Sequence, residues 1–129
     1  MPPEPPTPVT GSGPFAQGIR LFNEEYFFEA HEHLEDLWHV ERGEPRLFLQ
    51  GLIQVCAAFH HFQNGNLAGA VALLKRGADK MRKYPPRYMG LDAAGLLARV
   101  DTACERIERM RTGVEATAPI EFPKIDLPP

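Results

Sequence analysis

EAHEHLEDLW, residues 29–38, is the stretch that most constrains the fold. Its apolar residues recur at helical spacing, and at about 100° per residue the surrounding segment has two distinct faces. One face combines aromatic and apolar residues with an imidazole and a carboxylate, and it carries Phe27, Phe28, His31, Leu34, Glu35 and Trp38. The opposite face carries mainly acidic residues and is predicted to be solvated. Its members are Glu25, Glu29, Glu32, His33 and Asp36.

The overall composition is that of an ordinary globular chain, with 43% hydrophobic and 24% charged residues among 129. A net charge of −3 argues against a nucleic-acid partner, because such binding depends on phosphate neutralisation. No apolar run approaches the ~20 residues of a membrane span, and the first residues lack the features of a signal peptide. We therefore expect a cytoplasmic protein without a membrane partner, in which Cys56 and Cys104 are reduced and packed.

Helical periodicity and capping signals predict five helices, at 15–22, 24–40, 45–63, 67–83 and 93–111. Asn23, Asn66 and Asp92 are the predicted N-caps of the second, fourth and fifth helices. Pro45 suits a first helical turn, and Gly113 is placed to end the last helix. The predicted fold class is all-α, a compact bundle of four main helices plus a short N-terminal helix. No segment has strand periodicity.

Two terminal segments flank the helical bundle domain predicted at 14–112. Residues 1–13 contain five prolines, which predicts a disordered or loosely packed segment. Residues 113–129 are predicted to form an extended tail with four large apolar side chains, Ile120, Phe122, Ile125 and Leu127. We expect the tail to lie along the bundle, because burying each such side chain contributes ~1.5 kcal/mol or more. Docking on a neighbouring subunit is the alternative.

A faint internal repeat relates positions forty residues apart. The matching pairs are Phe22 with Phe62, Phe27 with Leu67, Ala30 with Ala70, and Leu34 with Leu74. Each copy reads as a turn followed by a helix with a small residue near its start. This pattern predicts two stacked helical hairpins.

The predicted helix at 45–63 offers polar partners for His31 and Glu35. A carboxylate among aromatic residues needs a partner, because its unpaired burial costs several kcal/mol. Gln50, Gln54 and His61 lie within about 40° of one another on the following helix. Antiparallel packing of the two helices would place Glu35 near Gln50 and His31 near Gln54. The candidate site, a buried polar cluster, comprises His31, Glu32, Glu35, Trp38, Gln50, Gln54 and His61.

Three uses of this cluster stay open: a hydrogen-bond network that sets helix register, a cleft for a peptide or small molecule, and a metal or catalytic site. The metal hypothesis assigns zinc, iron or manganese to His31, Glu35 and His61. Its weakness is that HEHLE is not H-E-x-x-H, because Glu35 stands where the second histidine would be. Nucleophilic catalysis has little support, since Ser12 is the only serine and lies in the loose segment.

The predicted helix at 67–83 and the residues after it are basic. Six cations follow one another within thirteen residues, namely Lys75, Arg76, Lys80, Arg82, Lys83 and Arg87. They predict a solvated face, with self-association between basic and acidic faces as the alternative. Gly69 and Gly77 on this helix favour close helix packing.

The segments YFFEAHEHLEDLW, FLQGLIQVCAAFHHFQNGN and GAVALLKRGADKM, followed by YPP, resemble the bacterial and archaeal family named domain of unknown function 309. The resemblance covers about residues 15–100. Its motif positions fall on His31, Glu32, Glu35, Trp38, Gln50, Gly51 and Gln54. It implies a compact all-helical bundle in a small stand-alone cytoplasmic protein, and no established activity.

The expectation that best fits these observations is a non-enzymatic binding or assembly module without a cofactor. Its partner would be a protein or a small molecule, and a homo-oligomer is compatible with the charge pattern. The enzyme alternative is a metal-dependent hydrolase at His31, Glu35 and His61.

Overall fold

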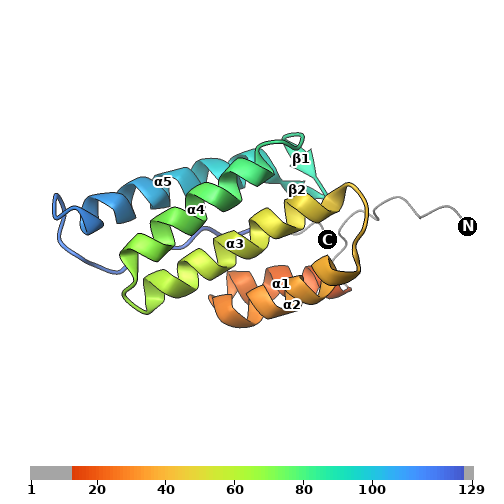
Figure 1. The fold of residues 1–129 in the computed structure, drawn as a ribbon, viewed down its shortest axis with the longest axis horizontal. Coiled ribbons are helices and arrows are strands. Elements are labelled where there is room, and N and C mark those ends of the chain that lie inside the picture. Colours follow the sequence, from red (N-terminus) through yellow and green to blue (C-terminus); the bar gives the residue numbers. More distant parts are fainter. Residues whose placement is uncertain (1–12, 127–129) are drawn as a thin grey trace, which may run out of the picture.

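The computed structural model describes residues 13–126, which form five helices and a two-stranded hairpin (Figure 1). In chain order the elements are α1 Pro14–Asn23, α2 Phe27–Val40, α3 Pro45–Gln63, α4 Leu67–Met81, β1 Arg87–Tyr88, β2 Leu91–Asp92 and α5 Ala93–Arg111. The predicted all-α bundle is confirmed. The segment predicted to be loose at 1–13 lies outside the described residues apart from Gly13, and so does Leu127.

The β1–β2 hairpin is an element that periodicity did not predict. Its antiparallel strands pair Arg87 with Asp92 and Tyr88 with Leu91. Met89 and Gly90, between the strands, have φ values of 52° and 79°. Two-residue strands are too short to produce a visible alternation of apolar and polar residues, so the sequence pattern carried no signal for them.

Helix α3 is the central element of the bundle. It lies between α2 and α4, while α1 packs against α2 and α5 packs against α4 (Figure 1). Ten of its nineteen residues are buried, so its apolar surface extends around most of the helix. Phe22 and Phe27 from the first two helices meet Phe59 of α3 in the core, with ring centroids 5.1 to 6.1 Å apart.

Helices α3 and α4 approach each other at a pair of glycines. A Cβ added at Gly77 would lie 2.5 Å from the carbonyl oxygen of Gly51, and one added at Gly51 would lie 2.7 Å from the carbonyl oxygen of Gly77. Neither backbone position leaves room for a side chain. The predicted close packing is therefore confirmed at Gly77. At Gly69 an added Cβ would instead meet the side chain of Asn66.

The two predicted hairpins, α1–α2 and α3–α4, have matching turns. Tyr26 N donates to Leu21 O at 3.0 Å, and Asn66 N, forty residues later, donates to His61 O at 2.8 Å. Both turns connect a helix to the next one through three residues. The internal repeat is therefore a repeat of structure.

Most of the predicted helix boundaries are confirmed. The side chains of Asn66 and Asp92 accept hydrogen bonds from Gly69 N and Gly95 N at 2.9 and 3.0 Å, as N-caps do. Pro45 begins α3, and α5 ends two residues before Gly113, whose φ is 81°. Helix α4 ends at Met81, two residues earlier than predicted.

The prediction that Asn23 caps the second helix is wrong. Asn23 is the last residue of α1, and α2 begins four residues later without a side-chain cap. The Asn23 side chain instead binds the C-terminal tail: its Nδ2 donates to Ile125 O at 2.8 Å, and its Oδ1 accepts from Ile125 N at 2.7 Å.

The tail, residues 114–126, passes behind α3 and α4 in Figure 1 and lies along the bundle, as predicted. Ile125 is buried, and the Phe122 ring packs 4.9 Å from Phe27 and 5.2 Å from Phe59. The extended tail therefore completes the core between α1–α2 and α5. Within residues 13–126, no helix combines the length and the apolar composition needed to cross a membrane.

Candidate functional site

Helix α2 presents Glu35 between two imidazoles. His31 Nε2 lies 3.3 Å from one Glu35 oxygen, and His39 Nε2 lies 3.6 Å from the other. Each imidazole is an i, i+4 neighbour of Glu35, so the three residues lie on the same side of α2. The Glu35 side chain is 41% exposed and that of His31 is 28% exposed. The carboxylate is therefore partly hydrated rather than buried.

The predicted network between α2 and the glutamines of α3 is not formed in the described part of the chain. Gln54 Oε1 accepts a hydrogen bond from Lys80 Nζ of α4 at 2.8 Å. No hydrogen bond within residues 13–126 joins Gln50 or Gln54 to α2, and no polar side chain there is fully buried. The error has a physical cause: α3 is apolar on several sides, so its periodicity did not indicate which side meets α2.

The side of α3 that meets α2 is not the strip with the glutamines but the apolar strip next to it. The Phe28 ring lies 5.2 Å from His60, a residue of the strip that also carries Leu49, Ile53 and Cys56. Gly51, on the far side of α3, meets α4. At about 100° per residue, the strip between these two contacts points outward. It is half-buried and carries Gln50, Gln54, Ala57 and His61.

The predicted residues therefore share an outer surface formed by α2, α3 and α4, here named the three-helix face. We define it by Phe28, Glu32 and Glu35 on α2, Gln50, Gln54, Ala57 and His61 on α3, Arg76 and Lys80 on α4, and Lys83 in the turn that follows α4. Its α2 edge is acidic and its α4 edge is basic. Five members of the predicted site lie at this surface rather than in the core, namely Glu32, Glu35, Gln50, Gln54 and His61, and the other two, His31 and Trp38, are half-buried on α2.

Trp38 lies at the end of α2 against the first turn of α3. The Arg46 guanidinium carbon is 3.9 Å from the Trp38 ring centroid, a cation–π geometry. Arg46 Nη1 also donates to the carbonyl oxygens of Trp38 and Glu41 at 2.6 and 2.8 Å. Arg46 therefore binds the carbonyl end of α2, where a cation is favourable. Trp38 helps to join α2 to α3.

Two shallow hollows adjoin Phe28 on the outer side of α2. One, of about 430 Å³, is lined by Glu25, Tyr26, Phe27, Phe28, Glu29, His60 and Gln63. The other, of about 230 Å³, is lined by Phe28, His31, Glu32, Glu35 and Asp36. Phe28 is 47% exposed and Tyr26 is 56% exposed, although both are large hydrophobic residues. His31 Nδ1 beside the second hollow is buried without a hydrogen-bond partner in the described residues.

The metal triad of His31, Glu35 and His61 is not assembled. His61 Nδ1 lies 3.3 Å from Asn66 Nδ2, at the α3–α4 turn. Within residues 13–126, no group of three histidine, cysteine or acidic side chains is close enough to hold a metal ion. The antiparallel arrangement was predicted correctly, but His61 lies on the outward strip of α3 and not on the strip that meets α2.

The two thiols are free and buried, as predicted. Burial raises the pKa of the Cys56 thiol far above its ordinary value, and burial likewise raises the pKa of Cys104. Because the thiolate is the nucleophilic form, neither cysteine is arranged for nucleophilic chemistry.

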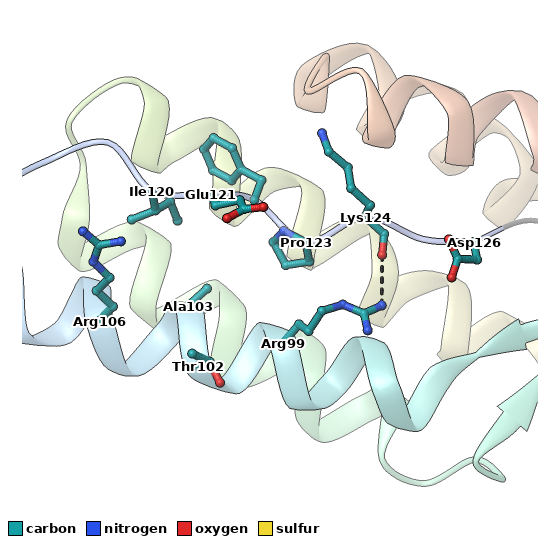
Figure 2. A pocket seen from close by; sticks show the side chains of 10 residues that line it. Arg99, Thr102, Ala103, Arg106, Ile120, Glu121, Pro123, Lys124 and Asp126 are labelled. Carbon is teal, nitrogen blue, oxygen red and sulfur yellow. Dashed lines mark hydrogen bonds between the residues drawn. The ribbon is translucent and has the colours of Figure 1, made fainter.

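A third hollow, of about 620 Å³, lies between α5 and the tail (Figure 2). Its cations already have partners: Arg99 donates to Lys124 O at 2.9 Å, Arg106 lies 3.6 Å from Glu115, and Lys124 Nζ donates to Asn23 O at 2.6 Å. These contacts hold the tail on α5 and α1. The charged side chains around this hollow therefore serve to attach the tail to the bundle.

Several residues of the surface were missed by the sequence reading. His39 stands four residues after Glu35, and this spacing was a usable signal. The contact of Arg46 with Trp38 and that of Lys80 with Gln54 depend on neighbouring helices, so local sequence carried no signal for them. The exposure of Phe28 was also missed, because its place in an aromatic stripe suggested the core.

Comparisons with known proteins identify relatives without assigned functions. Residues 15–73 match the model of the family described as Domain of unknown function (DUF309), which confirms the resemblance over that range. The uncharacterized protein YpuF of Bacillus subtilis (strain 168) is 29% identical over 106 residues, 78% of this chain and 59% of YpuF. An uncharacterized protein of Aquifex aeolicus (strain VF5) is 28% identical over 76 residues, 58% of this chain and 23% of that relative. The chain thus spans less than two thirds of the length of each relative.

Proposed function

We propose that this protein is a binding module that holds a cationic segment of a partner protein on the outer side of α2. The observation that carries the proposal is the exposure of Phe28 between two hollows rimmed by carboxylates. A large aromatic ring at the surface gains free energy when a partner covers it. The acidic groups around the ring select a partner of positive charge.

The chemistry of the surface suits lysine and arginine side chains. An ammonium or guanidinium group above the Phe28 face gains about 0.5–1 kcal/mol at an exposed site. Glu32, Glu35 and Asp36, which line the same hollow, add charge-assisted contacts. Each of these contacts is weak in water, so we expect a dissociation constant on the order of 10–100 μM for a short basic peptide.

A peptide of six arginines tests the proposal, with Trp38 fluorescence and amide chemical shifts as readouts. Trp38 is the only tryptophan in the chain, and it lies on α2 beyond the second hollow. We expect saturable binding, with the largest shifts in residues 25–39. Phe28→Ala should weaken binding about fivefold, because the cation–π contact is lost. The pair Glu32→Gln and Glu35→Gln should weaken it tenfold or more.

The matched control is Glu105→Gln, which removes one carboxylate from an exposed position of α5. It should leave the affinity unchanged within twofold. If Phe28→Ala binds the arginine peptide as tightly as the unsubstituted protein does, the attraction is a general effect of negative charge and the proposed site is wrong. A thermal melt of each variant establishes that the fold is retained.

A further inference from the structure

We infer that the cationic partner is a second copy of this chain, and that α4 of one copy lies on α2 of the other. This inference rests on the proposed function, since it names the occupant of the α2 surface. It is carried by the distribution of charge over the three-helix face. The acidic edge and the basic edge of that face belong to the same molecule, but α3 lies between them (Figure 1). The two edges therefore cannot meet within one chain.

The basic edge is available for such a contact. Arg76 and Lys83 are exposed. Arg76 lies one turn before Lys80 on α4, and Lys83 lies in the turn just after the helix, where its backbone N donates to Lys80 O at 3.3 Å. Lys80 is half-buried and donates to Gln54, which places this strip beside the outward strip of α3. Arg82, the C-cap residue of α4, does not belong to this edge, because it forms an ion pair with Asp101 of α5.

Symmetry selects one arrangement of two copies. Helices α2 and α4 lie on opposite sides of α3, and each is antiparallel to it, so they run in the same direction. A two-fold axis that lies in the interface and runs parallel to α3 places each α2 on the partner's α4. The acidic edge of each copy then contacts the basic edge of the other, which gives two such contacts. An axis in the same plane but perpendicular to α3 would place each α2 on the partner's α2 and each α4 on the partner's α4, so that like charges would face each other. Electrostatic complementarity therefore favours the first axis, which gives a closed, self-complementary interface.

The centre of the three-helix face is compatible with this contact. The outward strip of α3 would meet its own copy there, with Ala57 as its smallest member and with amides and an imidazole around it. Helix α3 has 19 residues and is therefore about 28 Å long. With three helices side by side at 8–10 Å spacing, the face covers roughly 700 Å², close to the ~800 Å² that each partner buries in a standard interface.

Light scattering coupled to size-exclusion chromatography, together with sedimentation equilibrium, measures the association. We expect a mass of twice the 14.5 kDa of the chain at protein concentrations near 100 μM. The dimer should dissociate on dilution, and its dissociation constant should rise tenfold or more between low and high salt, because exposed ion pairs are screened. A monomer at every concentration and at low salt would overturn the inference, and so would growth beyond a dimer.

Charge reversal tests the pairing of α2 with α4. Variant A carries Glu32→Lys and Glu35→Lys, and variant B carries Arg76→Glu and Lys83→Glu. Each alone should be monomeric, since both contacts become repulsive. An equimolar mixture of A and B should form a heterodimer, and one chain with all four changes should again form a homodimer. Restoration in both cases separates complementarity from damage to the fold, and a lack of restoration contradicts the inference.

The two proposals fail in distinguishable ways. If the unsubstituted chain is monomeric but binds the arginine peptide through Phe28, self-association is wrong and the cationic binding site stands. If the chain dimerises and variants A and B dimerise as well, the interface lies elsewhere and the inference is wrong. The control Glu105→Lys, on the exposed side of α5, should leave the dimer unchanged.

Discussion

The hairpins α1–α2 and α3–α4 share a fold but are stabilised by different contacts. The α3–α4 turn contains Gly65 at φ 79° and ends in Asn66, whose side chain caps α4. At the matching positions, the α1–α2 turn has Glu25 at φ 67° and Tyr26, which makes no side-chain cap. A non-glycine residue in the left-handed region costs roughly 1–2 kcal/mol. The first turn is therefore less favourable in its local conformation than the second.

Distant residues compensate for this difference. Gln63 Nε2 donates to Glu25 O at 3.2 Å, and Lys124 Nζ lies 3.2 Å from a Glu25 carboxylate oxygen. Asn23, just before the turn, is bound to Ile125. The comparison teaches that the second hairpin follows from its own residues, while the first depends on α3 and the tail. The proposed binding surface is on the hairpin that needs this external support.

The largest expected effect tests the helix contact within each hairpin. Gly77→Ala should lower the free energy of unfolding by about 3 kcal/mol, because the new methyl group would meet the backbone of Gly51. Gly18→Ala is the counterpart in the first hairpin, where the added Cβ would lie 2.7 Å from a methyl group of Leu34 and meet side-chain atoms rather than backbone. It should change stability by less than about 1 kcal/mol, since the gain in helix propensity offsets the contact. Urea denaturation measures both, and equal losses would contradict the comparison.

The next effect tests the support that the tail gives to the first hairpin. Phe122→Ala should lower the free energy of unfolding by about 2 kcal/mol, because the ring packs on Phe27 and Phe59. Amide hydrogen exchange should then accelerate more in α1 and α2 than in α3 and α4. Val114→Ala, at the exposed first position of the same tail, is the control and should have no measurable effect. Uniform acceleration over all helices would show that the tail does not act on the first hairpin in particular.

A smaller effect on stability is expected at the N-cap positions of α4 and α2. Asn66→Ala should cost about 1 kcal/mol of stability, because Gly69 N loses its side-chain acceptor. Tyr26 has φ −88° and ψ 68°, close to the −90° and 83° of Asn66. Tyr26→Asn should therefore add a cap to α2 and raise stability by about 0.5 kcal/mol. Thermal unfolding measures both changes, and a loss of stability in Tyr26→Asn would mean that the tyrosine ring contributes more than a cap would.

The smallest effects on stability are expected at the two turn residues with positive φ. Gly65→Ala should destabilise by about 1 kcal/mol, since alanine is strained at that φ. Glu25→Gly should stabilise by no more than about 0.5 kcal/mol, because relief of strain is offset by the greater flexibility of glycine in the unfolded chain and by the lost Lys124 pair. Chemical denaturation with repeated measurements can resolve the sign. A clear loss in Glu25→Gly would show that the Lys124 contact outweighs the strain.

Local residues were sufficient to predict most of the fold. The three-residue turn with Gly65 and Asn66, the proline at position 45 and the cap at Asp92 are short-range signals that act within one helical turn. The apolar tail was predictable because four large side chains among prolines have few alternatives to burial. The same short-range signals gave a wrong N-cap at Asn23. Asparagine is a good capping residue, but the Asn23 side chain binds Ile125, 102 positions away.

Helical periodicity predicted which polar residues share a strip on one helix, but not how the strips of different helices are arranged. The sequence placed an acidic, imidazole-bearing helix beside one with two glutamines, because helical periodicity fixes which residues share a strip on one helix. It could not decide which strip of α3 meets which neighbour, because α3 buries side chains towards both α2 and α4. That choice depends on the glycine contact between α3 and α4, which turns Gln50, Gln54 and His61 outward. Close packing between whole helices, rather than any local preference, therefore decided that these polar groups form a surface and not a buried network.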